Sequence, residues 1–598
     1  MSISKRKSRV PILILVAVTV LIWVVTTATA RKAARKSARK AARKSARKPA
    51  RKRHVMQQLE IKNDDNQLCL AKSAIVAEPD CATKHSKIGL VDPSEIRKVT
   101  VYDDWTNGTV ELNGEILNVS EGFITWPAPL ERATKFSVLP GLLTKETIDK
   151  VLSLLHPSKV KFDTALDTVD AMPTREIYLH DGMLGLFWHL FVTWTIIHAL
   201  LSHVCVCVYI WTGDRLGGGT EEKGQNKKRR RLRKKLLKVL TPVEEKITAY
   251  VRKTWPEVCN RGGGRKCRVC YSLVRRYLPH ARRTHNIHRD GQALVTAVVS
   301  LSDYGRDFLG GLYVAANNVG RKVIAQRKGD VVLHHYDLLH GVEVDDFSED
   351  EPSERWSWIM WFKDSETCEQ KGYEWSRGCA REGDALCQYF QGWRVHLDPS
   401  LSQQQHISRR EKWMKLSAEQ GFAEAAFKVG RSHFGHNNLT GAVWWLHQAH
   451  DWGEADASYQ LGHIVLKGLI KPSCRAPGES AREAAEIEAL GLFERAAVAG
   501  ASPFGGAQFA MYNIGIARLF GFAGLERNPA IAARWFLASR IPEGFMAYSL
   551  YLNSVGRKEE SEKMKAMAKK QGFPRNAGMR DQALFSLHGD WPKGPPLW

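Results

Sequence analysis

Two histidines and one aspartate in the middle of the chain have the types and order of metal ligands. His288 and Asp290 are separated by one residue. On an extended chain, side chains at positions i and i+2 point to the same side, so this imidazole and this carboxylate converge on one point. His340, in the sequence Leu-Leu-His-Gly-Val, supplies a third ligand from a distant part of the chain. Two imidazoles and one carboxylate on one face of a metal ion leave its other positions open to small molecules.

An arginine follows these residues and has the chemistry to hold an anion beside them. Arg355 and Ser357 are again in an i, i+2 relation, which puts both side chains on one face of a strand. A buried guanidinium binds a carboxylate through two parallel hydrogen bonds. The ligand set is typical of non-haem iron(II) oxygenases, so the sequence predicts an iron site with a carboxylate clamp. His334 and His335 are rival ligands, but the His-Gly-Val context favours His340.

Short strands separated by turns have to position this site. The pattern predicts strands at Leu294–Leu301, Gly311–Ala315, Lys322–Ala325, Asp330–His335 and Arg355–Phe362. Turn-forming sequences rich in Gly, Asp and Asn lie between several of them. Short strands at this spacing predict an antiparallel sandwich or barrel rather than a parallel α/β sheet.

The order of these features resembles the prolyl 4-hydroxylase-like branch of the 2-oxoglutarate- and iron(II)-dependent dioxygenases. The resemblance covers residues 134–365, apart from an insertion described below. It includes the run Phe136–Leu143 followed by a helix to Leu155, and Tyr277 ahead of the His-x-Asp motif. Leu309–Tyr313, which contains two adjacent glycines, also matches the family pattern.

The resemblance implies a double-stranded β-helix, or jelly roll, that catalyses an oxygenase reaction. It implies three Fe(II) ligands that form the catalytic site, namely His288, Asp290 and His340. It implies three residues on the co-substrate 2-oxoglutarate: Arg355 on the distal carboxylate, with Ser357 and Tyr277 as helpers. Such enzymes couple the oxidative decarboxylation of 2-oxoglutarate by O2 to the hydroxylation of a protein or peptide, here expected at proline. L-ascorbate is expected to keep the iron reduced.

One segment departs from the family pattern. The gap between His340 and Arg355 is longer than usual and is acidic from Glu343 to Glu354. We expect these acidic residues to form a solvated loop ahead of the strand that begins at Arg355. If His335 were the ligand instead, the gap would be longer still.

A loose repeat occupies residues 370–575. A large apolar residue is followed eight residues later by glycine at Trp375/Gly383, Trp413/Gly421, Trp445/Gly453, Leu492/Gly500 and Phe536/Gly544. Small residues let paired helices approach closely, and stacked pairs form a solenoid. The pattern resembles Sel-one-like repeats, relatives of the tetratricopeptide family. It implies an α-helical solenoid that binds a protein partner or, alternatively, only supports the barrel. Residues 576–598 are expected to be a tail.

The N-terminus predicts entry into the secretory pathway. Basic residues precede an apolar run at Val10–Val25, and a small-residue cleavage pattern ends at Ala30. Residues 1–30 are therefore a signal peptide or a membrane anchor, and we expect a lumenal or membrane-anchored protein of the endoplasmic reticulum or Golgi. The basic residues just after the apolar run would tend to keep that side of a membrane span in the cytoplasm, which disagrees with entry into the lumen. We still favour lumenal entry, because enzymes with the site chemistry described above work in the lumen.

A basic low-complexity tract follows at residues 31–53, with thirteen Lys or Arg and no acid. Such a tract either binds phosphates or an anionic membrane, or is a solvated spacer. We favour the spacer and do not expect nucleic acid as a partner, because no aromatic residue interrupts the tract to stack on bases. Residues 54–133 are interpreted as a variable N-terminal region.

A hydrophobic stretch at Met183–Trp211 and a basic run at Lys227–Lys235 interrupt the expected dioxygenase domain. The stretch has the length of a membrane span, but one span there would put two halves of one barrel on opposite sides of a membrane. We therefore interpret residues 183–231 as a looped-out insertion or a gene-model error. A hydrophobic hairpin on the membrane and a mistaken domain assignment are the alternatives. A helical run is expected beyond it, at Leu232–Trp255.

Charge and cysteine content narrow the classes of protein that remain. The formal net charge of +25 comes mostly from the two basic runs, so the rest of the chain is only mildly basic. Cys267 and Cys270 form a Cys-x-x-Cys without the second pair of a zinc site, so zinc is not expected. The leading hypothesis is a hydroxylase. The alternatives are a solenoid scaffold with an inactive dioxygenase domain and, less favoured, a hydroxylase that associates with chromatin through its basic tails.

Overall fold

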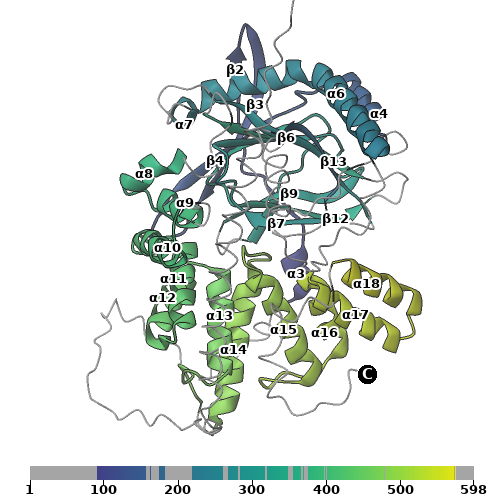
Figure 1. Cartoon of the computed structure of the whole chain (residues 1–598). Helices are drawn as coiled ribbons and strands as arrows, with labels where there is room; N and C mark the ends of the chain where they lie inside the picture. Colours follow the sequence, from purple (N-terminus) through teal and green to yellow (C-terminus); the bar gives the residue numbers. More distant parts are fainter. Residues whose placement is uncertain are drawn as a thin grey trace, which may run out of the picture. The chain divides into compact units, whose positions relative to one another are not determined.

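Two β-sheets occupy the middle of the chain, and helices follow them (Figure 1). The computed structural model describes residues 91–573 except for 157–159, 161, 163–173, 182–218, 260–266, 280–282, 317–319, 348–353, 365–367, 369–374, 396–397, 399, 477 and 572. The described residues all belong to one unit of the chain, residues 79–598. The expected signal segment, the basic tract at 31–53, the stretch at 183–211 and the tail at 576–598 therefore lie outside the described residues.

The larger sheet has the strand order β2-β3-β4-β11-β8-β13-β6-β5. Its strands are β2 (Thr106–Leu112), β3 (Glu115–Thr125), β4 (Ala133–Leu139), β5 (Glu176–Asp181), β6 (Arg268–Tyr277), β8 (Val295–Ser300), β11 (Val331–His335) and β13 (Arg355–Lys363). The smaller sheet has the order β1-β10-β9-β12-β7. Its strands are β1 (Thr100–Val101), β7 (Thr284–His288), β9 (Phe308–Ala316), β10 (Gly320–Val323) and β12 (His340–Phe347).

Strands β6 to β13 are paired from the outside inwards. The outermost pair is β6 with β13, followed by β7 with β12 and then β8 with β11. The innermost pair is the hairpin of β9 and β10. All four pairs are antiparallel, and they lie alternately in the larger and the smaller sheet. The barrel is therefore a double-stranded β-helix, as predicted. Each predicted strand coincides with an observed one.

Helices cover the outer face of the larger sheet. They are α4 (Lys145–Leu155), α6 (Gly219–Thr254) and α7 (Pro256–Cys259). In α4 the Thr144 side chain caps the N-terminus, and Ile148, Val151 and Leu155 lie on one buried face. Leu236 and Leu240 of α6 are fully buried in the same apolar cluster. The C-terminal part of the predicted insertion at 183–231, from Gly219, is helical and continuous with the helix expected at Leu232–Trp255, because helix α6 begins at Gly219 and includes the second basic run.

Two further predictions need correction. The predicted start of the barrel domain at residue 134 omits β1, β2 and β3, although β1 pairs with β10 and β3 pairs with β4. The acidic stretch was expected to be a solvated loop, but Glu343 to Phe347 continue strand β12. Glu343 is buried because its carboxylate forms ion pairs with Arg321 and Arg540. These cations make a buried acidic strand stable, and no sequence pattern links them to Glu343.

Eleven helices of the described chain follow the barrel, and they form the predicted solenoid (Figure 1). They are α8 (Arg377–Arg381), α9 (Ala385–Arg394), α10 (Gln403–Ala418), α11 (Ala423–Gly435), α12 (Leu439–Asp451), α13 (Ala455–Leu466), α14 (Ala481–Val498), α15 (Gly506–Phe520), α16 (Pro529–Ser539), α17 (Pro542–Ser554) and α18 (Lys558–Lys570). Gly421 and Gly453 have positive φ at turns between paired helices, which favours glycine. Gly544 lies inside α17, where a Cβ atom would be 2.4 Å from the carbonyl oxygen of Phe536 in α16, so it allows the close helix approach that the pattern predicts.

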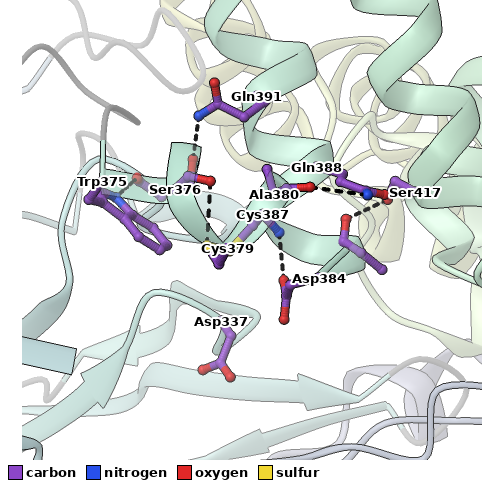
Figure 2. The surroundings of a disulfide bond; sticks show 12 residues. Asp337, Trp375, Ser376, Cys379, Ala380, Asp384, Cys387, Gln388, Gln391 and Ser417 are labelled. Carbon is purple, nitrogen blue, oxygen red and sulfur yellow. Dashed lines mark hydrogen bonds between the residues drawn. A yellow bond between two sulfur atoms is a disulfide. The ribbon is translucent and has the colours of Figure 1, made fainter. Parts of the chain in front are cut away.

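The barrel and the first repeats share one apolar core. A single cluster of buried side chains runs from the larger sheet to α13. At its centre, the rings of Tyr336 and Trp375 are 4.2 Å apart, and Phe390 packs on both. Figure 2 shows the disulfide that joins α8 to α9, between Cys379 and Cys387. The repeats are therefore part of the support of the barrel.

Two more disulfides lie in the barrel domain. Cys259 is bonded to Cys267, and Cys270 is bonded to Cys368. The cysteines of the Cys-x-x-Cys motif thus belong to two different disulfides, which agrees with the expectation that they do not bind zinc. No described helix combines the length and the apolar character needed to cross a membrane.

Candidate metal centre and carboxylate site

His288, Asp290 and His340 come together at one edge of the smaller sheet. His288 is the last residue of β7, His340 is the first residue of β12, and the two are paired across the strands. Asp290 lies in the turn that follows β7. One oxygen of Asp290 is 3.3 Å from Nε2 of His288, and the other is 3.8 Å from Nε2 of His340. All three ligand atoms lie within 4.8 Å of one another, which suits a single metal ion.

Backbone carbonyls fix the orientation of both imidazoles. Nδ1 of His288 is 2.7 Å from the carbonyl oxygen of Asn286, and Nδ1 of His340 is 3.1 Å from that of Leu338. A carbonyl only accepts hydrogen bonds, so Nδ1 carries the proton in each ring. Nε2 therefore presents its lone pair toward the aspartate. This is how metal-binding histidines are usually oriented.

The Asp290 carboxylate is held as an anion. Its oxygens accept hydrogen bonds from Thr296 at 2.6 Å, Trp361 at 3.0 Å and Gln292 at 3.1 Å. Burial favours a raised pKa for Asp290, but the adjacent His288, His340 and His334 side chains hold its pKa well below the usual range. Thr296 and Trp361 come from the larger sheet. The site therefore lies between the two sheets.

The neighbouring imidazole of His340 is held neutral. Burial, together with the nearby His334 and His288, lowers the pKa of His340 well below its ordinary value. A neutral imidazole and an ionised carboxylate are the forms that bind a divalent metal ion.

Arg355 is a buried cation that forms no ion pair with any carboxylate that the structure describes. Its side chain is 1% exposed, and Nε and one terminal nitrogen have no hydrogen-bond acceptor among the described residues. The guanidinium lies over the rings of Tyr277 and Phe308, with its carbon 5.1 and 5.5 Å from their centroids. The hydroxyls of Tyr277 and Ser357 are also buried without partners in the described structure. One cation and two hydroxyls with unused hydrogen-bonding capacity suit a carboxylate ligand.

Arg355 reaches across the barrel toward the strand next to the metal centre. A Cβ atom added to Gly311 of β9 would lie 3.4 Å from Nε of Arg355 and 2.8 Å from the Phe308 ring, so glycine is required there. Gly311 is three residues along β9 from Val314, and Val314 pairs with His340 of β12. Three residues of strand span roughly 10 Å, a separation that suits a short dicarboxylate.

The two rival histidines have different surroundings. His334 points into the barrel, where its ring lies 4.2 Å from the His340 ring, and its Nε2 has no partner among the described residues. His335 packs on the ring of Trp255 in the outer helical layer, with centroids 5.0 Å apart. Neither belongs to the described group that can share one metal ion.

The helical repeats hold the residues on both sides of Asp290. Arg289 is buried and forms an ion pair with Glu424, at the start of α11. Trp375, just ahead of α8, donates a hydrogen bond of 2.9 Å to the Gly291 carbonyl. These contacts fix the turn that carries the metal-binding carboxylate. No sequence signal pairs these residues, which lie far apart in the chain.

Comparison with family models and with curated proteins gives no match. Among solved structures, a Sel1 repeat protein from Oxalobacter formigenes is 20% identical, with a TM-score of 0.25, over 32% of this chain and 75% of that one. A Pseudomonas putida prolyl-4-hydroxylase is 13% identical, with a TM-score of 0.21, over 38% and 91%.

A prolyl hydroxylase from Trichoplax adhaerens, solved with a peptide fragment of the hypoxia inducible factor oxygen degradation domain, is 13% identical to this chain. Its TM-score is 0.24, over 40% of this chain and 87% of that one. At TM-scores this low, the likenesses carry no weight for function. The functional assignment therefore rests on the geometry of the site.

Proposed function

We propose that this protein is an Fe(II)- and 2-oxoglutarate-dependent dioxygenase. The observation that carries the proposal is a His-Asp-His group with preset lone pairs in the same barrel as a buried arginine that has no carboxylate partner in the described part of the chain. A structural arginine of this kind would normally be paired, because burying an unpaired charge is costly. A metal site beside a carboxylate clamp accounts for both features.

Each residue has a role that its surroundings support. His288, Asp290 and His340 would hold Fe(II), while Thr296 and Trp361 keep the carboxylate in place. Arg355, with Tyr277 and Ser357, would bind the distal carboxylate of 2-oxoglutarate and orient the co-substrate. When bound, the iron and 2-oxoglutarate supply the activation of O2, and L-ascorbate would keep the metal in its ferrous state.

We further propose that the substrate is a protein or peptide hydroxylated at proline. The solenoid that packs on the barrel offers an extended surface of the kind that binds polypeptides. We place the reaction in the lumen of the endoplasmic reticulum or Golgi. Three disulfides in which both cysteines are described, together with the disulfide-bonded Cys474, support an oxidising compartment, because such bonds are rare in the cytosol.

The experiment is a succinate-release assay with Fe(II), 2-oxoglutarate, ascorbate and proline-rich peptides, with hydroxyproline measured by mass spectrometry. It is run on the full chain and on a chain lacking residues 183–218, which keeps helix α6 complete. We expect turnover that the His288→Ala variant lacks.

The matched control is His335→Ala, which removes an imidazole that faces the outer layer and should leave turnover intact. Equal turnover in the His288→Ala and unaltered proteins would refute the metal assignment. Succinate release without any hydroxyproline would keep the dioxygenase and refute the proline substrate.

A further inference from the structure

A groove on the first helical repeats carries a concentration of positive charge. It has a volume of about 880 Å³ and lies between α9, α10 and α11, which are neighbours along the solenoid (Figure 1). Its lining includes five lysines and arginines: Arg410, Lys412, Lys415, Lys428 and Arg431. One acidic residue, Glu411, is present in the described lining, and it accepts a hydrogen bond of 2.7 Å from Ser432.

Most of these cations have no counter-charge in the described structure. Lys415 pairs with Glu419 at 3.7 Å on an exposed part of α10. Arg410, Lys412 and Arg431 form no ion pair with a described carboxylate. The described lining therefore carries more positive than negative charge, with five cationic side chains against Glu411 alone, and such a potential attracts anionic partners.

Lys428 sits deepest in this group. Its ammonium nitrogen lies 3.2 Å from the centroid of the Phe504 ring and 5.0 Å from that of Trp393. Burial and the nearby Arg431 lower the pKa of Lys428 to about 7. Aromatic rings contact the ammonium directly, while Asp456 and Glu454 act on it without forming an ion pair in the described structure, so an anion bound in the groove would add a direct partner.

The lining also includes apolar side chains, beside the polar Ser432, His433 and His436. Trp393, Met414 and Val429 contribute to it between the cations. A mixture of apolar side chains and unpaired cations is complementary to a chain segment that has acidic residues next to an apolar one.

We propose that this groove binds an acidic polypeptide segment that carries an apolar anchor residue. The lysines and arginines would pair with its carboxylates, and the apolar anchor would contact Met414 and Val429. Single-stranded nucleic acid fits less well, because it needs open aromatic faces for stacking. The Trp393 ring already stacks on Phe504, with centroids 6.5 Å apart.

The groove is close to the contact between the repeats and the metal-binding turn. Glu424, which pairs with Arg289 beside Asp290, is one helical turn before Lys428 on α11. One turn advances roughly 6 Å along the helix. A bound segment would therefore lie close to the helix end that supports the catalytic domain. Binding itself does not depend on the proposed enzymatic activity.

The test is a fluorescence anisotropy titration of the full-length protein with a labelled peptide rich in Asp and Glu around a central Phe. Comparison probes are the same peptide with Lys in place of the acids, the acidic peptide with Ala in place of Phe, and a single-stranded oligodeoxynucleotide of equal charge. The double variant Arg410→Gln, Arg431→Gln removes two groove cations. The matched control is Lys558→Gln, Lys569→Gln, which removes two exposed cations from α18.

We expect the acidic Phe peptide to bind, with an affinity that falls as salt is added. The groove variant should weaken binding about tenfold, since each cation contributes modestly, and the α18 variant should leave it unchanged. Three outcomes would overturn the proposal: no binding of the acidic peptide, equal weakening by both variants, or tighter binding of the oligonucleotide than of the peptide. Retained affinity after Phe is replaced by Ala would refute the apolar anchor.

Discussion

Replacing Arg355 by methionine should stabilise the free protein and abolish its response to 2-oxoglutarate. Methionine keeps much of the length of the side chain but removes a charge that is 1% exposed and has no carboxylate partner in the described chain. Most substitutions in a protein core destabilise it, so a gain in stability here would be specific to a residue retained for binding.

The size of the gain follows from two opposing contributions. A buried charge without a partner costs several kcal/mol. The cation–π contacts of Arg355 with the rings of Tyr277 and Phe308 offset about 0.5–2 kcal/mol of this cost each. The net gain should be about 1–3 kcal/mol, which raises the Tm of a cooperative unit of about 500 residues by about 1–3 °C. Saturating ligand at a hundred times its Kd would add about 2.7 kcal/mol to the unaltered protein and nothing to the variant.

Thermal unfolding is followed without O2, with Mn(II) in place of Fe(II), in the presence and absence of 2-oxoglutarate. The matched control is Arg276→Met on β6. Arg276 is paired with Glu354, so this variant should lose about 1–3 kcal/mol and keep its response to the ligand. An Arg355→Met protein that is less stable than the unaltered one and is still stabilised by 2-oxoglutarate would refute the reasoning.

Four other predictions follow from the same structure. Thr296→Val removes the 2.6 Å hydrogen bond to Asp290 and should weaken Mn(II) binding by about 10–100-fold in calorimetric titration, with little change in Tm. Glu424→Gln leaves Arg289 buried without its carboxylate partner, so it should lower the free energy of unfolding by about 3 kcal/mol and also weaken metal binding. Adding Arg289→Met should restore part of the lost stability. Burial and the adjacent Asp456 raise the pKa of Glu454 well above the ordinary pKa of a glutamate, about 4.5, so the native state loses stability as the pH rises beyond that value. Glu454→Gln should therefore be increasingly stabilising from pH 5 to pH 8 in denaturant titrations. If the chain enters the secretory pathway, the exposed Asn118 in Asn-Val-Ser should carry a glycan, and Asn118→Gln should remove a mobility shift that glycosidase treatment also removes.

The sequence predicts the barrel better than it predicts what surrounds the barrel. The i, i+2 spacing of His288 and Asp290 and the strand pattern after them are local, and the structure brings both side chains together with His340. Arg355 and Ser357 likewise face the interior, because alternation along a strand does not depend on distant contacts. The pairing of Arg321 with Glu343 is different, because it links strands whose register no local pattern specifies. For the same reason, the acidic stretch looked like a loop although part of it is a buried strand.

The repeats show why a division into domains can hide a functional connection. A tandem repeat suggests an independent module, and the sequence offers no reason to connect it to the metal ligands. In the structure, Glu424 holds Arg289 and Trp375 holds Gly291, so the two neighbours of Asp290 both depend on helices that follow the barrel. Metal ligands need fixed geometry, and a turn is less rigid than a strand. We infer that the solenoid supplies the rigidity that the turn lacks, so a disturbance of its first helices reaches the metal site directly.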